Sequence, residues 1–319
     1  MNAATDTELQ AISRIRANLE TCILGKSEEI NLLLTALLAN GHVLLEDVPG
    51  TGKTMLIKAL AKSINGDFRR IQCNPDLLPT DITGVSIYHP REETFIYRPG
   101  PVMTNILLAD EINRATTKTQ SALLEAMEER HVTVDGERHQ LPEPFLLLAT
   151  QNPIDFEGTY VLPEAQLDRF LMKFKLGYPE EQEEKRMLLA QSALHPLETI
   201  GPVTDIPTIL ALQRRARGVH VSDAVAEYIV QIVRRTREHP DLVLGASPRA
   251  TIALTQAAKA YALISGRDYV LPDDIKHLAR HVLGHRMILS PEARMAGASA
   301  ATVLQSVFRQ VKVPVGTEK

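Results

Sequence analysis

The 319-residue chain contains no Trp, only two Cys, and Phe, Tyr and Trp together at 4%. Cys22 and Cys73 are far apart and have no histidines at metal-ligand spacing around them, so neither a disulfide framework nor a zinc site is expected. No apolar run approaches the roughly 18–20 residues that span a bilayer, and the N-terminus lacks a basic stretch followed by an apolar one. We therefore expect a cytoplasmic protein with reduced cysteines, no secretory signal and no membrane insertion.

An excess of basic residues is also missing. The chain has 35 Lys and Arg against 39 Asp and Glu; residues 1–179 carry 17 against 24, and residues 180–319 carry 18 against 15. Neither half has the positive charge of a nucleic-acid-binding surface, and the arginine clusters at 214–217 and 234–237 have no interleaved aromatic residues to stack on bases. We therefore expect no nucleic-acid partner. The opposite signs favour halves that meet each other, within a chain or between chains.

Apolar residues make up 44% of the chain, which is enough to bury a globular core. In residues 1–179 short apolar runs alternate with helical patterns, as in a parallel sheet with helical crossovers. The expected strands are Val43–Glu46, Arg69–Gln72, Ile106–Asp110, Phe145–Thr150 and Leu171–Phe174. The expected helices are Ser27–Ala39, Lys53–Ile64 and Lys118–Arg130.

Two β-hairpins interrupt this alternation. Val85–Tyr88 and Thr94–Tyr97 flank a polar loop, and both alternate apolar with polar or aromatic residues. His131–Val134 and Glu137–Gln140 flank Asp135-Gly136, a strong hairpin signal because both turn residues tolerate positive φ. Inserted hairpins project from a sheet and often carry function.

After Tyr178-Pro179 the sequence contains only helical patterns. Several begin with Pro near the first helical position, which is typical of helix starts. The sequence therefore predicts an α/β domain over residues 1–179 and an all-α domain over residues 180–319. The expected helices are Glu181–Leu194, Ile206–Arg217, Ser222–His239, Pro248–Ser265, Pro272–Leu283 and Pro291–Val311.

A phosphate-binding loop is predicted by Asp47-Val48-Pro49-Gly50-Thr51-Gly52-Lys53-Thr54, which follows an expected strand and opens an expected helix. Its two glycines let backbone N–H groups converge on phosphate at the positive end of a helix dipole. Lys53 is expected to contact the β and γ phosphates, and the Thr54 hydroxyl to bind Mg²⁺. Asp47 stands where the GxxxxGK[ST] pattern has its first Gly. Asp tolerates left-handed φ, so we expect an intact loop; the effect of Asp47 on nucleotide affinity stays open.

A second motif lies about 60 residues downstream, where the apolar strand Asn105–Ala109 leads into the adjacent carboxylates Asp110 and Glu111. Successive strand residues point to opposite sides, so the two carboxylates can have different roles. Asp110 is expected to hold the magnesium shell, and Glu111 to orient and polarise the attacking water. A lone Asp-Glu pair is usually a solvated strand end. Together with the upstream loop it predicts a nucleotide hydrolase.

Five segments carry a resemblance to a known family. Val48–Thr54 (VPGTGKT), Leu108–Arg114 (LADEINR) and Ala149–Pro153 (ATQNP) resemble the AAA+ ATPases. Leu162–Phe170 (LPEAQLDRF) and Gly245–Ala250 (GASPRA) resemble, more narrowly, the MoxR family. The resemblance covers nearly the whole chain, from Ile23 to Pro314. It implies a P-loop AAA+ domain with inserted hairpins over residues 1–179, and a helical lid over residues 180–319.

The resemblance also assigns roles residue by residue. Asn152 matches the sensor 1 residue that helps to position the lytic water. Arg169 matches the arginine finger, which reaches the γ-phosphate bound by a neighbouring subunit, and Arg249 matches sensor 2, which couples the lid to the nucleotide. A structural ion pair remains open for both arginines. Ile23, Leu24 and Gly25 match the segment that packs on adenine, and Tyr178-Pro179 matches the hinge into the lid.

The function implied by the resemblance is a Mg²⁺-dependent ATPase that assembles into a ring, expected to be a hexamer. Members of the MoxR family are thought to act as chaperone-like machines on protein complexes, often with partners that bear von Willebrand factor A domains. A nucleic-acid motor, a nucleotide-gated scaffold and the ATPase subunit of a metal chelatase are the open alternatives. The client protein, the pathway and the size of the ring stay open.

Overall fold

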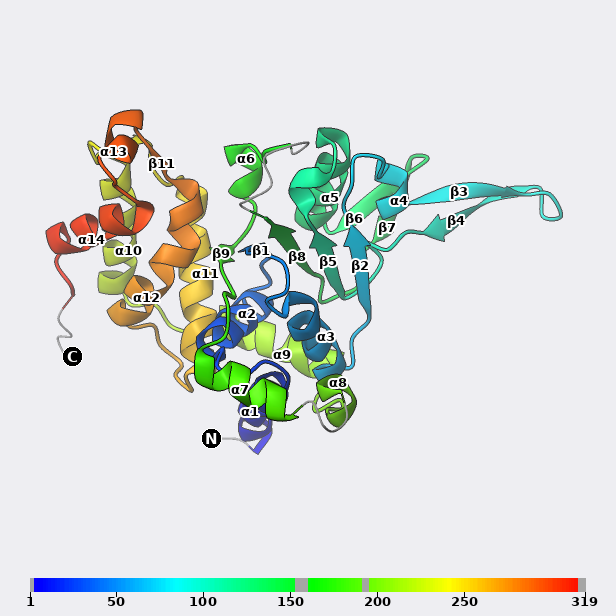
Figure 1. Ribbon diagram of the computed structural model, residues 1–319, viewed down its shortest axis with the longest axis horizontal. Helices are drawn as coiled ribbons and strands as arrows, with labels where there is room; N and C mark the ends of the chain where they lie inside the picture. The colour runs from blue at the N-terminus through cyan, green and yellow to red at the C-terminus, as the bar shows by residue number, and fades with distance from the viewer. Residues whose placement is uncertain (1–2, 153–159, 191–194, 315–319) are drawn as a thin grey trace. The chain divides into compact units, whose positions relative to one another are not determined.

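The computed structural model describes residues 3–152, 160–190 and 195–314 (Figure 1). Contacts divide the chain into two compact units. The first comprises residues 1–30, 42–162 and 174–211, and the second comprises residues 31–41, 163–173 and 212–319. Both units include chain from each side of the boundary that the sequence predicts at residue 179, and that boundary stays a prediction.

The chain contains a five-stranded sheet in the order β2-β5-β8-β1-β9, of which β1, β2, β5 and β8 belong to the first unit. The pairs β2–β5, β5–β8 and β8–β1 are all parallel, which confirms the predicted α/β class. Strands β1, β5 and β8 are buried along nearly their whole length, as their continuous apolar sequences indicate. The strands are β1 (Val43–Glu46), β2 (Phe68–Gln72), β5 (Ile106–Asp110), β8 (Leu146–Gln151) and β9 (Met172–Phe174).

The predicted helices of residues 1–179 are found within one residue of their expected bounds. A further helix, α1 (Ala3–Cys22), was not predicted, although Ile12, Ile15 and Leu19 recur at helical spacing and are buried. It packs against α3. The helices are α2 (Ser27–Leu38), α3 (Lys53–Ser63) and α5 (Thr117–Glu129), with the short α4 (Pro79–Thr83) and η1 (Ile112–Arg114). Two more follow the sheet, α7 (Glu181–Ala190) and α8 (Pro196–Thr199).

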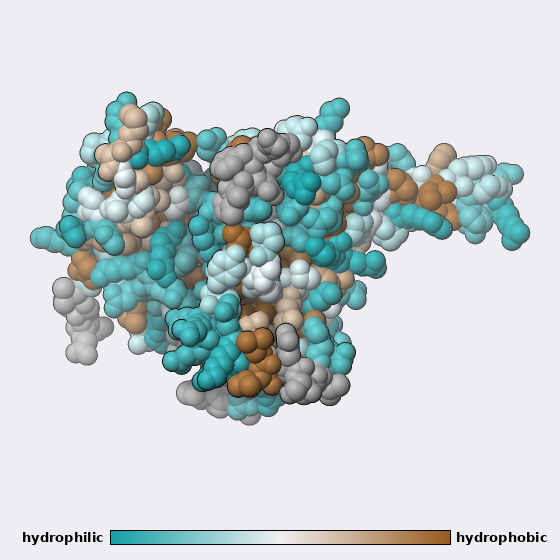
Figure 2. Space-filling view, in the orientation of Figure 1, coloured by the Kyte–Doolittle hydropathy of each residue, from teal (hydrophilic) through white to brown (hydrophobic). Residues whose placement is uncertain are grey.

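Both predicted hairpins are confirmed. Strands β3 (Gly84–His89) and β4 (Thr94–Pro99) pair antiparallel and project from the unit (Figure 1). Their exposed side chains include large apolar ones, seen as brown patches along the projection (Figure 2). Strands β6 (His131–Val134) and β7 (Glu137–Gln140) join through Asp135 and Gly136, whose φ angles of 51° and 84° are both positive.

The second unit is mainly helical. Its long helices are α10 (Asp223–Arg237), α11 (Pro248–Ile264) and α12 (Pro272–Leu283), while α9 (Ile206–Arg217) runs across the division between the units. The short α6 (Glu164–Leu167) and η2 (Gly284–Arg286) also belong to it. A two-stranded pairing of β10 (Leu242–Leu244) with β11 (Ile288–Leu289) was not predicted, because two or three residues are too few to establish a strand period.

The prediction of one continuous helix over Pro291–Val311 is wrong. The segment forms α13 (Pro291–Met295) and α14 (Ala300–Gln310). Gly297 between them has φ +82°, a left-handed conformation that ends a helix. Ser299 then caps α14 by accepting a hydrogen bond from the backbone N–H of Thr302.

A buried histidine, His42, links two elements of the first unit. Its Nδ1 accepts a hydrogen bond from the backbone N–H of Leu147 at 2.9 Å, so the proton lies on Nε2, which faces the carbonyl oxygen of Met127 at 3.1 Å. Burial, reinforced by the positive charge of Arg130, lowers the pKa of His42 well below 6.5. The folded protein therefore holds this ring neutral.

We expect His42 to make the protein less stable in mild acid. Below about pH 6.5 the unfolded chain takes up a proton that the folded state excludes, so the free energy of unfolding falls by up to about 1.4 kcal/mol per pH unit. Asn at position 42 keeps an acceptor for the Leu147 N–H but does not titrate. In urea unfolding at about pH 7.5 and about pH 5.5, His42→Asn should lose less stability than wild type by about 1 kcal/mol or more. Equal losses would contradict the prediction.

Candidate functional site

A cavity of about 560 Å³ lies in the first unit, where the carboxyl ends of β2, β5 and β8 meet the loop between β1 and α3. Parallel sheets place their ligands at this edge, because the strand ends and the loops that follow them converge there. Its lining combines cations, carboxylates, amides and hydroxyls. The lining residues are Asp47, Pro49, Gly50, Thr51, Gly52, Lys53, Thr54, Met55, Lys58, Arg70, Gln72, Asp110, Glu111, Thr150, Asn152, His195 and Leu197.

The phosphate-loop backbone has the conformation that its glycines predict. Gly50 and Gly52 both have φ +88°, which residues with a Cβ adopt only with strain. Helix α3 begins directly afterwards at Lys53, so its free N–H groups and the positive end of its dipole lie at the cavity. The Lys53 ammonium donates to the carbonyl oxygen of Val48 at 2.6 Å. The geometry matches a cradle for phosphate.

The backbone conformation that places the two carboxylates, Asp110 and Glu111, at the cavity was not predicted from the sequence. Strand β5 ends at Asp110, and Glu111 has φ 55° and ψ 53°, a left-handed conformation. The expectation that the side chains point apart as strand neighbours is therefore wrong, since both line the same cavity. Residues other than Gly adopt this conformation at a cost of about 1–3 kcal/mol, and such residues concentrate at functional sites.

Thr150, at the end of β8, positions both carboxylates. Its hydroxyl donates to Asp110 Oδ1 at 2.6 Å and accepts from the backbone N–H of Glu111 at 2.8 Å. The sequence placed Thr150 in a strand and in the ATQNP segment but gave it no role of its own. The available signal was its place at the carboxyl end of the strand beside β5, since neighbouring parallel strands end at the same edge.

Two residues of β2 were also missed. Arg70 donates to Asp110 Oδ2 at 2.6 Å, and the Gln72 amide donates to Glu111 Oε2 at 3.1 Å. Arg114 reaches the same oxygen of Glu111, also at 3.1 Å. Each carboxylate thus has a donor from the neighbouring strand, which fixes its direction, and Arg70 and Arg114 balance part of the negative charge.

Both cysteines are free and buried, as expected for reduced core residues. Burial raises the pKa of the Cys73 thiol to about 12, and the charges of Asp110 and Glu111 act in the same direction. The thiol therefore stays protonated beside the site. Within the described residues, no three His, Cys, Asp or Glu side chains come together as a metal-binding group.

The cavity brings together most of the predicted site residues. From the loop it includes Pro49 to Thr54, and from the strand ends it includes Asp110, Glu111 and Asn152. Val48, Leu24 and Gly25 do not line it. Ile23 lies beside it, since its Cδ1 is 3.2 Å from the position that a Cβ on Gly52 would take. Packing of Ile23, Leu24 and Gly25 on adenine stays a prediction, as do the roles given to the other residues.

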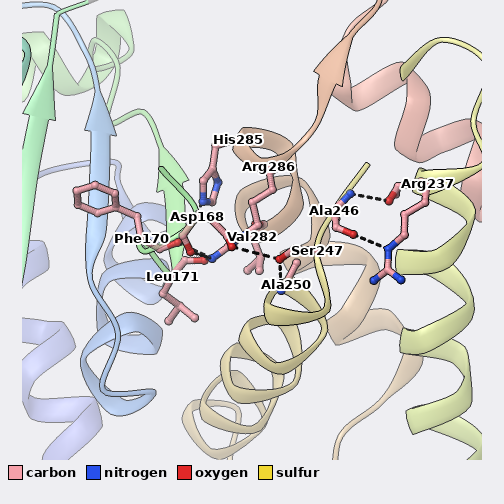
Figure 3. A network of polar contacts seen from close by, with 11 residues as sticks. Asp168, Phe170, Leu171, Arg237, Ala246, Ser247, Ala250, Val282, His285 and Arg286 are labelled. Atoms are coloured by element: carbon pink, nitrogen blue, oxygen red, sulfur yellow. Dashed lines mark hydrogen bonds and ion pairs between the residues drawn. The ribbon is translucent and has the colours of Figure 1, made fainter. Parts of the chain in front are cut away.

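Arg169 and Arg249 belong to the second unit, where a polar network links the segments that carry them (Figure 3). Asp168, directly before Arg169, accepts from Arg286 Nε at 2.6 Å and from the Ser247 hydroxyl at 3.2 Å. Ser247 also caps α11, which contains Arg249 at its start. The two predicted functional arginines thus lie on segments joined through one carboxylate.

Arg286 organises this network. Its side chain is 3% exposed and its guanidinium donates to five acceptors, so all its N–H groups are used. The acceptors are Asp168 Oδ1 and the carbonyl oxygens of Asp168, Phe170, Leu171 and Val282. The sequence does not point to Arg286, because nothing in its neighbourhood distinguishes it from a solvated arginine.

The comparisons with known proteins agree with this fold. Residues 42–172 match the ATPase family associated with various cellular activities (AAA), and residues 234–307 match the AAA lid domain. A solved structure of a candidate ATPase from Cytophaga hutchinsonii superposes with a TM-score of 0.91 at 39% identity, covering 98% of this chain and 97% of that one. The parallel sheet, the phosphate loop and the helical lid define an AAA ATPase.

Similar sequences narrow the assignment. The protein named chaperone MoxR1 of Mycobacterium tuberculosis is 42% identical over 96% of this chain and 83% of its own length. The uncharacterized protein YeaC of Bacillus subtilis is 58% identical over 92% of both chains. This chain belongs to the MoxR family of AAA ATPases. None of the helices in the described part of the chain is both long and apolar enough to cross a membrane.

Proposed function

We propose that the protein is a Mg²⁺-dependent ATPase that hydrolyses ATP at the subunit interfaces of a ring and remodels protein complexes as a chaperone-like machine. One observation supports it above all: the cavity gathers Lys53, Asp110 and Glu111 with the cradle of Gly50 and Gly52. Binding phosphate requires the lysine and the cradle, while hydrolysis requires the carboxylates. A site that served binding alone would not need Glu111.

The donors in the cavity fit a magnesium ion with a bound triphosphate. Mg²⁺ prefers oxygen ligands and usually takes one or two protein ligands, completing its shell with phosphates and waters. The Thr54 hydroxyl and the Asp110 carboxylate are such ligands and line the same cavity as Lys53. Bound there, the ion would neutralise charge on the phosphates. The Arg70 side chain is nearly half exposed in its ion pair with Asp110. Breaking this pair so that Asp110 can bind the ion therefore costs little free energy.

The remaining residues act on water and phosphate. Lys53 leaves the Val48 carbonyl to hold the β and γ phosphates. Glu111, directed by Gln72 and the Thr150 hydroxyl, orients the attacking water and accepts its proton. Asn152, which lines the cavity beyond β8, helps to position that water. An arginine from outside the cavity would add a further cation at the γ-phosphate.

We assign that cation to Arg169 of a neighbouring subunit, as an arginine finger. Charge on the transferred phosphoryl group grows towards the transition state, and a guanidinium supplied in trans stabilises it. Hydrolysis then requires assembly, and a ring closes so that every site receives one finger. Arg249 is assigned to sensing the nucleotide bound by its own subunit.

The relative named chaperone MoxR1 supports a protein client, since this chain is 42% identical to it. The long hairpin of β3 and β4 also presents exposed apolar side chains, including Phe95 at 69% exposure, and surfaces of this kind bind other proteins. We include a protein with a von Willebrand factor A domain among the expected partners. The formal charge of −4 argues against nucleic acid as the client.

A trapped complex tests the proposed function. Glu111→Gln should retain bound ATP and hold the client, so tagged protein is recovered from a lysate with ATP and with ADP, and bound proteins are identified by mass spectrometry. Lys53→Ala, which loses the phosphate contact, is the control. A protein recovered only by Glu111→Gln with ATP supports client remodelling. Recovery of DNA instead of protein would contradict it and favour a nucleic-acid motor.

A further inference from the structure

Asp47 replaces the first glycine of the phosphate-loop pattern, yet its carboxylate is directed inwards. The residue is 6% exposed. Its Oδ1 accepts from the backbone N–H of Val48 at 2.9 Å, and its Oδ2 accepts from the Thr51 hydroxyl at 3.2 Å. Burying a carboxylate costs free energy unless hydrogen-bond donors replace the water that it loses. The contacts of Asp47 with Val48 and Thr51 therefore stabilise its buried position.

The same oxygen holds a second segment of the chain. The backbone N–H groups of Leu176 and Gly177 each donate to Asp47 Oδ2 at 2.8 Å. Successive N–H groups that converge on one oxygen form a concave anion site, and Gly177 at φ +68° supplies the left-handed conformation that such a site uses. These residues, with the loop, belong to the first unit and lead into α7.

The contacts of Lys53 connect this arrangement to phosphate. Its ammonium donates to the carbonyl oxygen of Val48 at 2.6 Å and to that of Asp47 at 3.5 Å. When Lys53 turns to a phosphate, its ammonium moves relative to these two carbonyl oxygens. Phosphate binding therefore changes the backbone contacts of the residue whose side chain holds Leu176 and Gly177.

We propose that Asp47 is a positioning residue that transmits nucleotide occupancy of the phosphate loop to the segment entering α7. The five residues Asp47, Val48, Thr51, Leu176 and Gly177 form what we call the Asp47 latch. A glycine at position 47 would allow the same loop but could not hold the second segment. The inference rests on the proposed function, because it requires nucleotide to bind at Lys53.

Hydrogen exchange at two named amides tests the latch. Exchange of the Leu176 and Gly177 N–H groups is followed by mass spectrometry in the full-length protein, with Mg²⁺ and either ADP or a non-hydrolysable ATP analogue, or with Mg²⁺ alone. In wild type, nucleotide should slow exchange at these amides by roughly tenfold, because the ordered loop fixes the carboxylate. In Asp47→Gly, nucleotide should still bind but change the exchange less than about twofold.

Two further variants sharpen the result. Asp47→Ala keeps a Cβ but removes both carboxylate oxygens, so it should show the same loss of response, and it decides the matter if Asp47→Gly does not fold. Lys26→Met is the matched control. Lys26 donates to the carbonyl oxygen of Tyr178 at 2.9 Å and so holds the same segment without touching the loop. Its nucleotide response at Leu176 and Gly177 should be retained.

The possible outcomes distinguish a failure of the Asp47 latch from a failure of the proposed ATPase function. Nucleotide binding measured by calorimetry, with equal slowing in wild type and both Asp47 variants, would overturn the latch and leave the proposed function standing. A lost response in Lys26→Met as well would also overturn it, since any loosening of the segment would then suffice. Wild type that binds no nucleotide would overturn the proposed function and the coupling together.

Discussion

Replacing Arg169 with Ala is expected to lower ATP turnover by roughly 10³–10⁵-fold, the effect of an arginine finger on phosphoryl transfer. Binding of ATP should change little, because Arg169 lies outside the cavity of its own first unit. The loss should appear in kcat, since the guanidinium acts on charge that develops only in the transition state. Steady-state hydrolysis and ATP titration measure the two quantities. Arg294→Ala, which removes an exposed arginine of α13, is the control.

Mixing two inactive variants tests whether the finger acts in trans. A subunit with Arg169→Ala retains an intact cavity, and a subunit with Glu111→Gln retains its finger. Where a Glu111→Gln subunit adjoins an Arg169→Ala subunit, its Arg169 completes the intact cavity of that neighbour. The mixture should therefore recover a substantial part of wild-type turnover. Inactive mixtures under conditions where the variants assemble together would show that Arg169 does not act across the interface. Full turnover in Arg169→Ala alone would remove its assigned role.

Arg286→Met is expected to lower the free energy of unfolding by about 3–5 kcal/mol, the cost of breaking a buried ion pair on one side. Met fills similar volume but donates no hydrogen bond. Asp168 would lose its strongest partner, and three buried carbonyl oxygens of the 168–171 segment would lose a donor. Urea unfolding of the full chain measures the change.

A surface pair of similar chemistry provides the control. Arg235 contacts Glu238 at 3.2 Å, but both side chains are more than half exposed, so Arg235→Met should cost no more than about 1 kcal/mol. Comparable losses in Arg286→Met and Arg235→Met would contradict the role given to the buried network. ATP turnover should also fall in Arg286→Met, because the segments before Arg169 and Arg249 are joined through Asp168.

Local patterns were enough to predict the elements that carry the chemistry. The phosphate loop is recognised by its glycines, because glycine adopts positive φ without strain. The buried strands are recognised by their continuous apolar runs. The turn at Asp135-Gly136 follows the same logic. These features depend on near neighbours in the chain, which is why the sequence alone places the loop, the carboxylates and the sheet.

The features that sequence reasoning missed depend on contacts between distant segments. Thr150 meets Asp110 across 40 positions, Arg286 meets Asp168 across 118, and Asp47 meets Gly177 across 130. In each pair the local sequence does not specify the distant partner. The left-handed turn at Glu111 was missed for another reason, since Glu has no preference for positive φ and only the surrounding structure imposes it.

Glu111→Gln tests the central claim most directly, that this cavity hydrolyses ATP with Glu111 activating the water. ATP binding and Mg²⁺-dependent phosphate release are measured on wild type and variant at a concentration where the protein assembles. We predict that wild type turns over ATP only with Mg²⁺, and that the variant binds ATP about as tightly while turnover falls by roughly 10²–10⁴-fold. Undiminished turnover in Glu111→Gln, or no ATP binding by wild type, would contradict the account.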